Sequence, residues 1–462
     1  MGVNSLKYDL SYLSIPLPED VSKLKYFGDF KGANALIDFL LERKSTPISL
    51  RKRLEIEKDV LGMMGNNEYP YSFEEARQMM TEDIKDFKAD ELVVLRNTGK
   101  VDWIYVDGEV KFQRRFLANL FKTQSTYSDR RISSEDNAVE VLRQQELDEN
   151  VVLMKEKGKR QVEITIKGSI KVKKEHERVG EKVKVYLPIP KACKQNSEIK
   201  IIRTSPTATF IAPEDEEQRT IYFETILEEN QVFEVTYSYV HTIPYRELDS
   251  DKAMVCDITT DLEEVLPHMA FTPYLENLLE EILEDETNPI KQARKIFDFV
   301  TTKVNYSFMR EYFTIENISE YAAVNLKGDC GVQAILFITL CRMSGIPAKW
   351  QSGLYVSSHY TGCHDWAQFY VAPYGWVHAD LSFAGGAYRN KKLERWNYYF
   401  GNLDIFRMVA NSAIQQDFNP AKAELRADPI DNQRGEFEYV GQGLPYACLE
   451  VSQELVEMKE LN

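Results

Sequence analysis

Long hydrophobic runs are absent from this sequence of 462 residues. No stretch approaches the roughly 20 apolar residues that a membrane-spanning helix needs, so we expect no membrane span. The first nine residues contain neither the basic nor the apolar segment of a secretory signal peptide, and Leu6 stands where a myristoylation signal requires Ser or Thr. We therefore expect a cytoplasmic protein, although a chain whose signal peptide had been removed would look the same.

Cysteine is scarce, and the sequence also lacks the common cofactor-binding motifs. A phosphate-binding loop, a dinucleotide-binding fingerprint and an EF-hand-type calcium loop are all missing, so we expect no cofactor. The scattered cysteines do not form the dense framework of a disulfide-stabilised secreted domain, and they fit a reducing compartment better. They are Cys193, Cys256, Cys330, Cys341, Cys363 and Cys448.

Positive charge is in deficit. The 57 Lys and Arg residues are outnumbered by 73 Asp and Glu residues, which gives a formal net charge of −16. No Lys/Arg-rich block with interleaved aromatic residues is present, so nucleic acid is not expected as a partner. The acidity favours cationic substrates only mildly, since a net charge of this size is explained equally well by solubility.

The chain is long enough for two to four domains. Residues 1–150 are predicted to form a mainly helical accessory region. Ser72 and Glu75 have the spacing of a capping box at a helix start, and Asp107-Gly108 between alternating apolar residues predicts a hairpin with a type I′ turn. No set of catalytic side chains is visible there, so we expect an accessory or interaction role.

The rest of the chain is predicted to contain three segments of different character. Residues 151–250 alternate between apolar and polar side chains, which is typical of an antiparallel β-sandwich-like domain. Helical periodicity returns at about residue 270, and we expect a catalytic core over residues 260–415. Residues 416–462 are charged and contain three prolines, which favours a C-terminal tail packed on the core. The predicted fold class is α+β.

The most informative stretch begins at Cys330. Asp329 and Gly331 flank this cysteine, and an apolar run of helical length follows it. Gly345 and Pro347 mark the end of that run. Cys330 is therefore predicted at the N-terminus of a buried helix. The dipole and free N–H groups there favour a thiolate, and they lie near the oxygen of any carbonyl that the sulfur attacks.

A nucleophilic thiolate also needs a base and a group that orients the base. His364 and Asp380 follow in that order, in two β-rich segments separated by a turn at Pro373. Because side chains alternate along strands, these two residues share a face only if the hairpin has an odd-length loop or a bulge, as in a register that pairs Asp380 with Trp366. We expect such a hairpin, with the His364 ring contacting both the Cys330 sulfur and the Asp380 carboxylate.

Four linked motifs over residues 290–385 resemble the transglutaminase-like superfamily of cysteine acyltransferases and peptidases. They are Gly-Asp-Cys at a helix start, Gly-Ile-Pro-Ala after that helix, a His-x-Trp strand and a Gly-Trp-x3-Asp strand. A β-rich domain before the core is similar to the arrangement in bacterial members. The resemblance implies a papain-like core of helices packed on an antiparallel sheet. It also implies that Cys330 is the nucleophile, His364 the base and Asp380 the orienting residue.

Other residues can contribute to such a site. A second donor to the oxyanion, besides the Cys330 N–H, could come from Tyr306, Asn325 or Gln333, and the sequence does not choose among them. Core packing is the alternative for Tyr306. Trp366 could wall the cleft, and core packing is equally compatible with its position on the strand.

Simpler interpretations exist for each predicted catalytic residue taken alone. A cysteine before an apolar helix is usually part of the core, and an aspartate at a strand end usually forms a turn. A zinc site built from His359, Cys363, His364 and His378 lacks a standard ligand spacing, so we expect no metal. The prediction of catalysis depends on three residues occurring in order and in the right contexts.

The resemblance implies a thiol-dependent amide hydrolase that acts on a peptide or protein amide through a thioacyl-enzyme. A protein-glutamine acyltransferase would use the same intermediate, but only about 50 residues and no calcium loop follow the predicted core, so we expect hydrolysis. A transglutaminase fold that serves as a non-catalytic interaction scaffold is the second alternative. The sequence leaves the substrate and the oligomeric state open.

Overall fold

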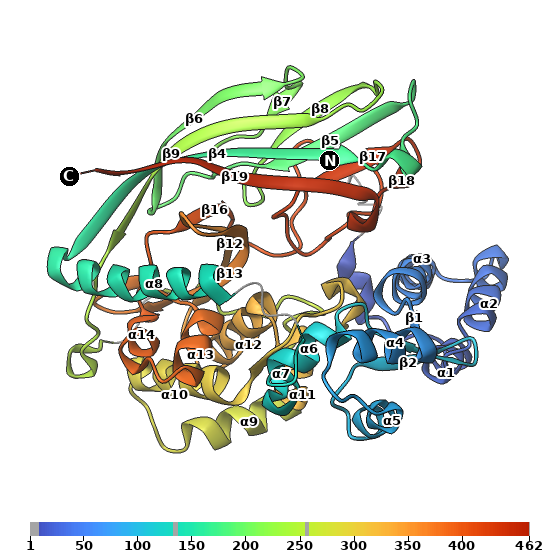
Figure 1. Ribbon diagram of the computed structural model, residues 1–462, viewed down its shortest axis with the longest axis horizontal. Coiled ribbons are helices and arrows are strands. Elements are labelled where there is room, and N and C mark those ends of the chain that lie inside the picture. Colours follow the sequence, from blue (N-terminus) through green and yellow to red (C-terminus); the bar gives the residue numbers. More distant parts are fainter. Residues whose placement is uncertain (1–8, 133–136, 255–257, 462) are drawn as a thin grey trace.

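The computed structural model describes residues 9–132, 137–254 and 258–461. The prediction that residues 1–8 carry no leader, and the residue Cys256, lie outside the described residues. A layered β-domain sits above a mixed helix and sheet core (Figure 1). The helices within residues 19–97 lie at one side of that core, and the helix over residues 137–157 lies between the core and the β-domain. No helix in the described parts of the chain is long and apolar enough to cross a membrane.

The N-terminal region is built from helices and one small sheet. The capping box is confirmed, because the Glu75 backbone N–H donates to the Ser72 hydroxyl and the Ser72 N–H donates to the Glu75 carboxylate. The hairpin is also confirmed, with positive φ angles at Asp107 and Gly108. The elements are η1 (Leu10–Ser14), α1 (Glu19–Phe27), α2 (Phe30–Glu42), α3 (Ile48–Met63), η2 (Met64–Glu68), β1 (Tyr71–Ser72), α4 (Phe73–Asp83), α5 (Ala89–Asn97), β2 (Trp103–Val106), β3 (Glu109–Phe112), α6 (Phe116–Thr123), α7 (Ser125–Ser128) and α8 (Asn137–Lys157).

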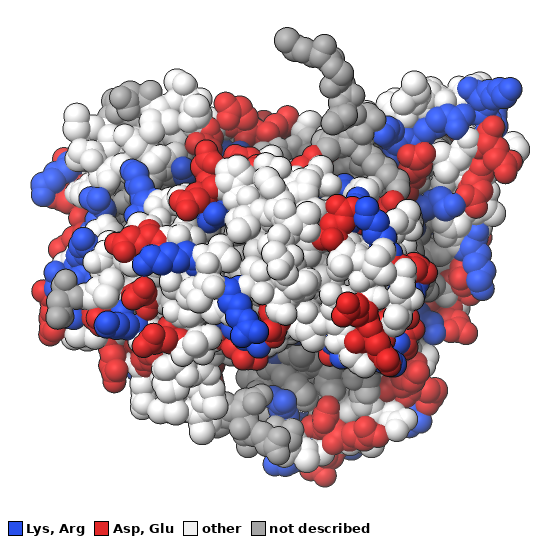
Figure 2. Space-filling view, turned by 90° about the horizontal axis from the view of Figure 1, so that it is seen from above, with Lys and Arg blue, Asp and Glu red and all other residues white. Residues whose placement is uncertain are grey.

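The β-domain consists of two antiparallel sheets, with strand orders β18-β17-β5-β8-β7 and β19-β4-β9-β6. Alternate residues of β4, including Ile164 and Ile166, are buried between the sheets. On the face seen from above, Lys and Arg side chains are mixed with Asp and Glu, and the described residues there form no continuous basic area (Figure 2). The elements up to residue 252 are β4 (Lys159–Val172), η3 (Lys174–His176), β5 (Lys182–Pro188), β6 (Asn196–Ser205), β7 (Phe210–Ile211), β8 (Thr220–Ile226), β9 (Phe233–Pro244) and η4 (Ser250–Lys252).

The C-terminal residues differ from the expected tail. Two strands extend the β-domain, because β17 (Glu436–Tyr439) pairs with β5 and β19 (Leu449–Leu461) pairs with β4 along its length. Between them lie β18 (Gln442–Gly443) and η6 (Tyr446–Cys448). Apolar residues at alternating positions, such as Leu449 and Phe437, supply the buried face. Residues 416–435 link the two parts of the molecule. Phe418 and Ala421 contact Tyr186 of β5, and Gln433 donates to the His364 carbonyl oxygen in the core.

The core places helices against the five-stranded sheet β15-β14-β13-β12-β16. Its central helix, α12, is buried from Gly331 to Cys341, so it can form only where the sheet and other helices surround it. The predicted α+β class with antiparallel sheets is confirmed. The elements are α9 (Pro273–Leu283), α10 (Pro289–Lys303), β10 (Asn305–Tyr306), η5 (Tyr312–Thr314), α11 (Ile318–Asn325), β11 (Lys327–Gly328), α12 (Cys330–Met343), β12 (Ala348–Val356), β13 (Thr361–Val371), β14 (Gly375–Ala379), α13 (Leu381–Arg389), α14 (Leu393–Tyr398), β15 (Phe400–Gly401) and β16 (Arg407–Asn411).

The hairpin of β13 and β14 has the register that the sequence argument required. Val371 pairs with Gly375 and Ala367 pairs with Ala379, so three residues lie between the last paired positions. Continued by one step, this register sets Asp380 opposite Trp366. The odd-length loop is confirmed, and it puts Asp380 on the same face of the hairpin as His364.

Candidate active site

Asp380 and His364 are joined as predicted. The distance between His364 Nε2 and Asp380 Oδ2 is 2.7 Å, and Asp380 is fully buried. The Asp380 carboxylate also accepts a hydrogen bond from the Phe383 backbone N–H, which makes it the N-cap of α13. A side chain fixed by these contacts holds the imidazole in one orientation.

A buried arginine completes this cluster. The Arg407 guanidinium lies 2.8 Å from Asp380 and also pairs with Asp404. Burial alone would raise the pKa of Asp380, but His364 and Arg407 together lower it to about 2. Asp380 is therefore ionised at neutral pH and can only accept hydrogen bonds.

The charge on Asp380 defines the tautomer of His364. Burial lowers the pKa of His364, which outweighs the opposing effect of Asp380, so the ring is neutral at neutral pH. An ionised carboxylate accepts only, so Nε2 carries the proton and Nδ1 has the free lone pair. An imidazole in this state can accept a proton at Nδ1.

Cys330 is the first residue of α12, as predicted, and Asp329 is its N-cap. The Asp329 carboxylate accepts hydrogen bonds from the helix backbone and from the Tyr312 hydroxyl. Gly331 lies against the same groups, since a Cβ there would be 2.3 Å from Tyr312 Oη and 2.8 Å from Asp365 Oδ2. A larger residue at this position would displace the Tyr312 and Asp365 side chains beside the sulfur.

The sulfur has a different partner from the one expected. Cys330 Sγ donates to Asp365 Oδ2 at 3.1 Å, and within the described residues no hydrogen bond joins it to the His364 ring. Consecutive strand residues point to opposite faces, so His364 and Asp365 leave β13 on different sides. Helix α12 covers the Asp365 side, as the contact between the Phe337 and Phe369 rings indicates.

This contact reverses the expected effect on the thiol. Burial, Asp365 and Asp329 all raise the pKa of Cys330 well above its ordinary value. The expectation of an easily ionised thiol at the helix end is wrong for this conformation. A helix N-terminus favours an anion by about 0.3–1 kcal/mol. Burial shifts a pKa by up to about 3–5 units, and each unit is about 1.4 kcal/mol.

Asp365 is itself held by the segment that follows the core. The Gln433 side-chain amide donates to Asp365 Oδ1 and, at 3.0 Å, to the His364 carbonyl oxygen. Burial and the neighbouring Asp431 carboxylate raise the pKa of Asp365 well above its ordinary value. Residues 428–433 therefore form one side of the Cys330 environment. The predicted tail packed on the core is present in this short segment.

The further candidates occupy different positions. Tyr306 is close enough to Cys330 that the thiolate contributes, after burial, to the raised pKa of its phenol. The Asn325 amide is exposed and donates to the Tyr321 carbonyl oxygen at 2.8 Å, so it is not the second oxyanion donor in this conformation. Gln333 is buried and donates to the Gly328 carbonyl oxygen at 2.9 Å, so it supports the loop before the cysteine.

Trp366 lies beneath the histidine and does not wall a cleft. Its side chain is fully buried, and its indole N–H donates to Gln351 Oε1 at 2.8 Å. The ring centroids of Trp366 and His364 are 6.1 Å apart. Core packing is therefore the correct interpretation of Trp366.

The sequence argument missed four residues of this site, namely Asp365, Arg407, Asp404 and Gln433. Asp365 could have been found, because it follows His364 directly and strand alternation sets it on the opposite face. The other three lie after the recognised motifs, in segments without a distinctive pattern. Only the folded chain brings them to the hairpin.

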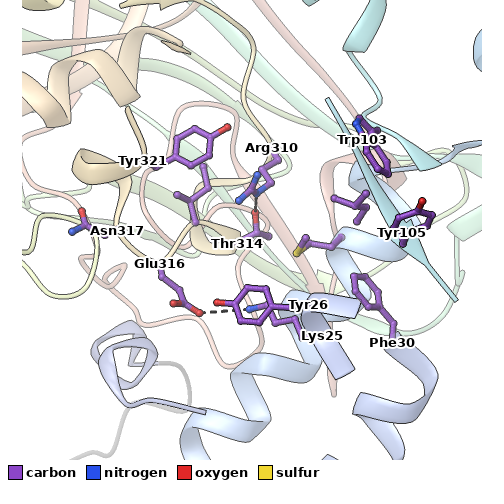
Figure 3. Close-up of a pocket in the computed structure, with 13 residues that line it drawn as sticks. Lys25, Tyr26, Phe30, Trp103, Tyr105, Arg310, Thr314, Glu316, Asn317 and Tyr321 are labelled. Atoms are coloured by element: carbon purple, nitrogen blue, oxygen red, sulfur yellow. Dashed lines mark hydrogen bonds and ion pairs between the residues drawn. The ribbon is translucent and has the colours of Figure 1, made fainter. Parts of the chain in front are cut away.

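A cavity of about 460 Å³ lies between the N-terminal region and the core, but the three predicted catalytic residues do not line it (Figure 3). Its charged groups already have partners, since Arg310 Nε donates to Thr314 Oγ1 at 3.1 Å and Lys25 lies 3.5 Å from Glu316. The lining is otherwise rich in aromatic side chains, which are Tyr26, Phe30, Trp103, Tyr105 and Tyr321.

One family model matches part of the chain. A family model described as the transglutaminase-like superfamily matches residues 276–381, which include Cys330, His364 and Asp380. A candidate cysteine protease from Cytophaga hutchinsonii is similar in structure, with 14% identity, a TM-score of 0.40, and coverage of 65% of this chain and 91% of that chain. The periplasmic domain of TgpA from Pseudomonas aeruginosa has 14% identity, a TM-score of 0.28, and coverage of 48% and 76%. No protein of curated function matches the chain.

Proposed function

Because residues 276–381 belong to the transglutaminase-like superfamily, we propose that this protein is a thiol-dependent amide hydrolase that acts on a peptide or protein substrate. The observation that carries the proposal is the buried hydrogen bond between His364 and Asp380. It gives the imidazole a defined tautomer with a free Nδ1, as a general base requires. Cys330 at the start of α12 is the nucleophile.

In the proposed reaction, His364 Nδ1 takes the proton of the Cys330 thiol, and the sulfur attacks the amide carbonyl carbon. The backbone N–H groups at the start of α12 stabilise the oxyanion. Collapse of the tetrahedral intermediate breaks the C–N bond, and the imidazolium returns the proton to the leaving amine. Water then hydrolyses the thioester, which releases the acid and restores the thiol.

The contact between Cys330 and Asp365 belongs to a resting form in this scheme. The thiol is protonated and faces Asp365, whereas His364 leaves β13 on the opposite face. The reaction therefore requires the start of α12 and β13 to move relative to each other until the sulfur reaches His364. Substrate binding at the start of α12 would displace the thiol from Asp365. The proposal therefore assigns Asp365 to the resting form and His364 to the reaction.

Activity-based labelling tests the proposal. We expect an electrophilic amide mimic to label Cys330 in the wild type, and a panel of peptide and glutamine-amide substrates to yield turnover that C330A abolishes. H364Q should retain the fold and lose about 10²- to 10⁴-fold in rate, the usual contribution of a general base. Turnover that survives in C330A would overturn the proposal.

The same experiment separates hydrolysis from transfer. A glutamine-containing peptide is supplied with excess primary amine, and the free acid and the amine adduct are quantified by mass. Hydrolysis predicts mainly free acid. Predominant adduct would identify a protein-glutamine acyltransferase with the same thiol chemistry.

A non-catalytic scaffold is the second candidate, and the Cys330 environment favours it. Burial, Asp365 and Asp329 raise the pKa of the Cys330 thiol, and a raised thiol pKa is expected for an unreactive core cysteine. A scaffold predicts no labelling of Cys330 by any amide mimic and no turnover across the substrate panel. We also propose a cytoplasmic location and no nucleic-acid partner. An accessory role for residues 1–150 and for the β-domain of residues 151–250 is likewise a proposal.

A further inference from the structure

A second cavity, of about 310 Å³, lies between the β-domain and the core. Residues at the ends of β4 and β9 and before β6 line one side, and residues of the β13–β14 hairpin line the other. Cys330, His364 and Asp380 do not line it. The cavity is therefore a separate feature from the proposed catalytic site.

The charge of this cavity is opposite to that of the whole chain. Lys159, Lys194 and Arg246 line it, and no acidic side chain does, in a protein with a net charge of −16. None of these three cations forms a salt bridge with any described residue. Many other lysines, such as Lys167 and Lys182, pair with a glutamate on a neighbouring strand. Three unpaired cations around one cavity form a field that an anion would neutralise.

Neutral hydrogen-bonding groups face the same space. Gln368 and His378 are cross-strand partners, and both line the cavity. His378 Nδ1 is buried without a hydrogen-bond partner among the described residues. Burial and the nearby cationic groups, including Arg246 and Lys349, lower the pKa of His378 to about 3. His378 is therefore a neutral donor or acceptor beside the cations.

We propose that this cavity binds a small molecule through a phosphate or carboxylate group. Lysine and arginine side chains form strong charge-assisted hydrogen bonds with both groups. The uncharged Gln368 and His378 side chains can complete the coordination of the anion without repelling it. The indole of Trp376 also lines the cavity, and Lys349 Nζ lies 4.0 Å from its ring centroid, which extends the positive field to this wall.

Calorimetry on the full-length protein tests this site with three probes, namely inorganic phosphate, pyrophosphate and citrate. We expect saturable millimolar or tighter binding of at least one probe, and the stronger of pyrophosphate and citrate identifies the preferred anionic group. The double variant K194Q/R246Q should bind at least about tenfold more weakly, because each charge-assisted contact contributes roughly that factor. The matched variant K200Q/R203Q removes the same charges from exposed positions of β6 outside the cavity and should bind like the wild type.

Two results would overturn the proposal. One is the absence of saturable heat with all three probes, and the other is equal affinity in the wild type and K194Q/R246Q. Lysine footprinting gives an independent check that needs no variant. A bound probe should slow acetylation of Lys159 and Lys194 relative to Lys200. Equal slowing at all three lysines would also contradict an anion-binding site in this cavity.

Discussion

At the scale of single residues, the surroundings of the Cys330 sulfur decide how easily the thiol ionises. A helix N-terminus stabilises the thiolate, but the Asp365 carboxylate 3.1 Å from the sulfur and the burial of the site act in the other direction. The second effect is larger, because a buried anion beside another anion is far more costly than a helix dipole is favourable. Burial is the largest cause of the raised thiol pKa, and Asp365 is the charged residue that adds most to it.

Replacing Asp365 should make Cys330 more reactive. In D365N the amide has nearly the same shape without the negative charge, so the thiol pKa falls and alkylation by limiting iodoacetamide at pH 7 becomes several-fold faster. Peptide mass spectrometry across a pH series measures the rate at each cysteine. Cys448 in the same sample serves as the internal control and should be unchanged. Slower alkylation of Cys330 in D365N would instead make Asp365 the base.

A matched pair of variants distinguishes the catalytic role of Asp380 from the structural role of Asp404. Both carboxylates are buried and pair with Arg407, but only Asp380 touches His364. We expect D380N to lose about 10²- to 10⁴-fold in turnover because the imidazole loses its orientation. D404N should keep most of its turnover at a temperature where it is folded. Both variants should lose up to about 3–5 kcal/mol in urea unfolding, since each removes one partner of a buried charge pair.

The sequence predicted one of the two main contacts of this site and not the other. The contact between His364 and Asp380 follows from strand parity, which depends only on the loop length of one local hairpin. Strand parity does not predict the partner of Cys330. It shows that His364 and Asp365 point to opposite faces of the sheet, but it does not show which face a helix will cover. That choice is made by packing between α12 and the whole sheet.

At the scale of elements, the buried residue His268 connects a loop to the start of α11. The His268 carbonyl oxygen accepts hydrogen bonds from the Ile318 and Ser319 backbone N–H groups at the start of α11. Its ring lies 2.9 Å from Gln415 Oε1, and burial lowers its pKa from 6.5 to about 4. This ring therefore stays neutral in the folded protein at pH values where an unfolded chain would protonate it.

His268 should make the protein lose stability in acid. Below pH 6.5 the unfolded state binds a proton at this residue while the folded state does not, until the pH reaches about 4, so each step down in this window favours unfolding. Relative to H268Q, the wild type should lose up to about 3 kcal/mol of unfolding free energy between pH 7 and pH 4. Urea titrations at several pH values measure the difference. The exposed His176 provides the control variant H176Q, which should follow the wild type, and parallel curves for wild type and H268Q would contradict the argument.

Element types were predicted best where the signal is local. The capping box at Ser72, the hairpin turn at Asp107 and the start of α12 each depend on a few neighbouring residues, and all three are present. The long charged strand β19 gave no such signal. Its glutamates face outward along an edge, so its apolar residues are too few to mark a strand before its partner is known.

At the scale of the whole molecule, the core is inserted into the β-domain. The chain builds β4 to β9, continues through the core, and returns to add β17 to one sheet and β19 to the other. Arg160 and Glu460, which are 300 residues apart, form an ion pair across this closure. Sequence reasoning could not find this, because the pairing joins segments that share no local pattern.

Removing residues 449–462 should therefore damage the β-domain and not merely trim a tail. The outer edge of β4 would lose its partner, and an unpaired edge exposes hydrogen-bonding groups and favours association between chains. We expect a lower melting temperature and oligomers in size-exclusion chromatography. The point variant V456K changes an exposed residue of the same strand and should behave like the wild type. A monomeric deletion variant with an unchanged melting temperature would refute this role of β19.

Because β19 is synthesised long after β4, β4 has no partner on this edge for much of the chain's synthesis on the ribosome. When β4 emerges, its final neighbour is still some 300 residues from being made. At translation rates of about 5–20 residues per second, that interval lasts roughly 15–60 s. During this time the nascent β-domain presents an open strand edge beside a core that is still growing, so the cell has to keep neighbouring nascent chains apart until the last strand arrives.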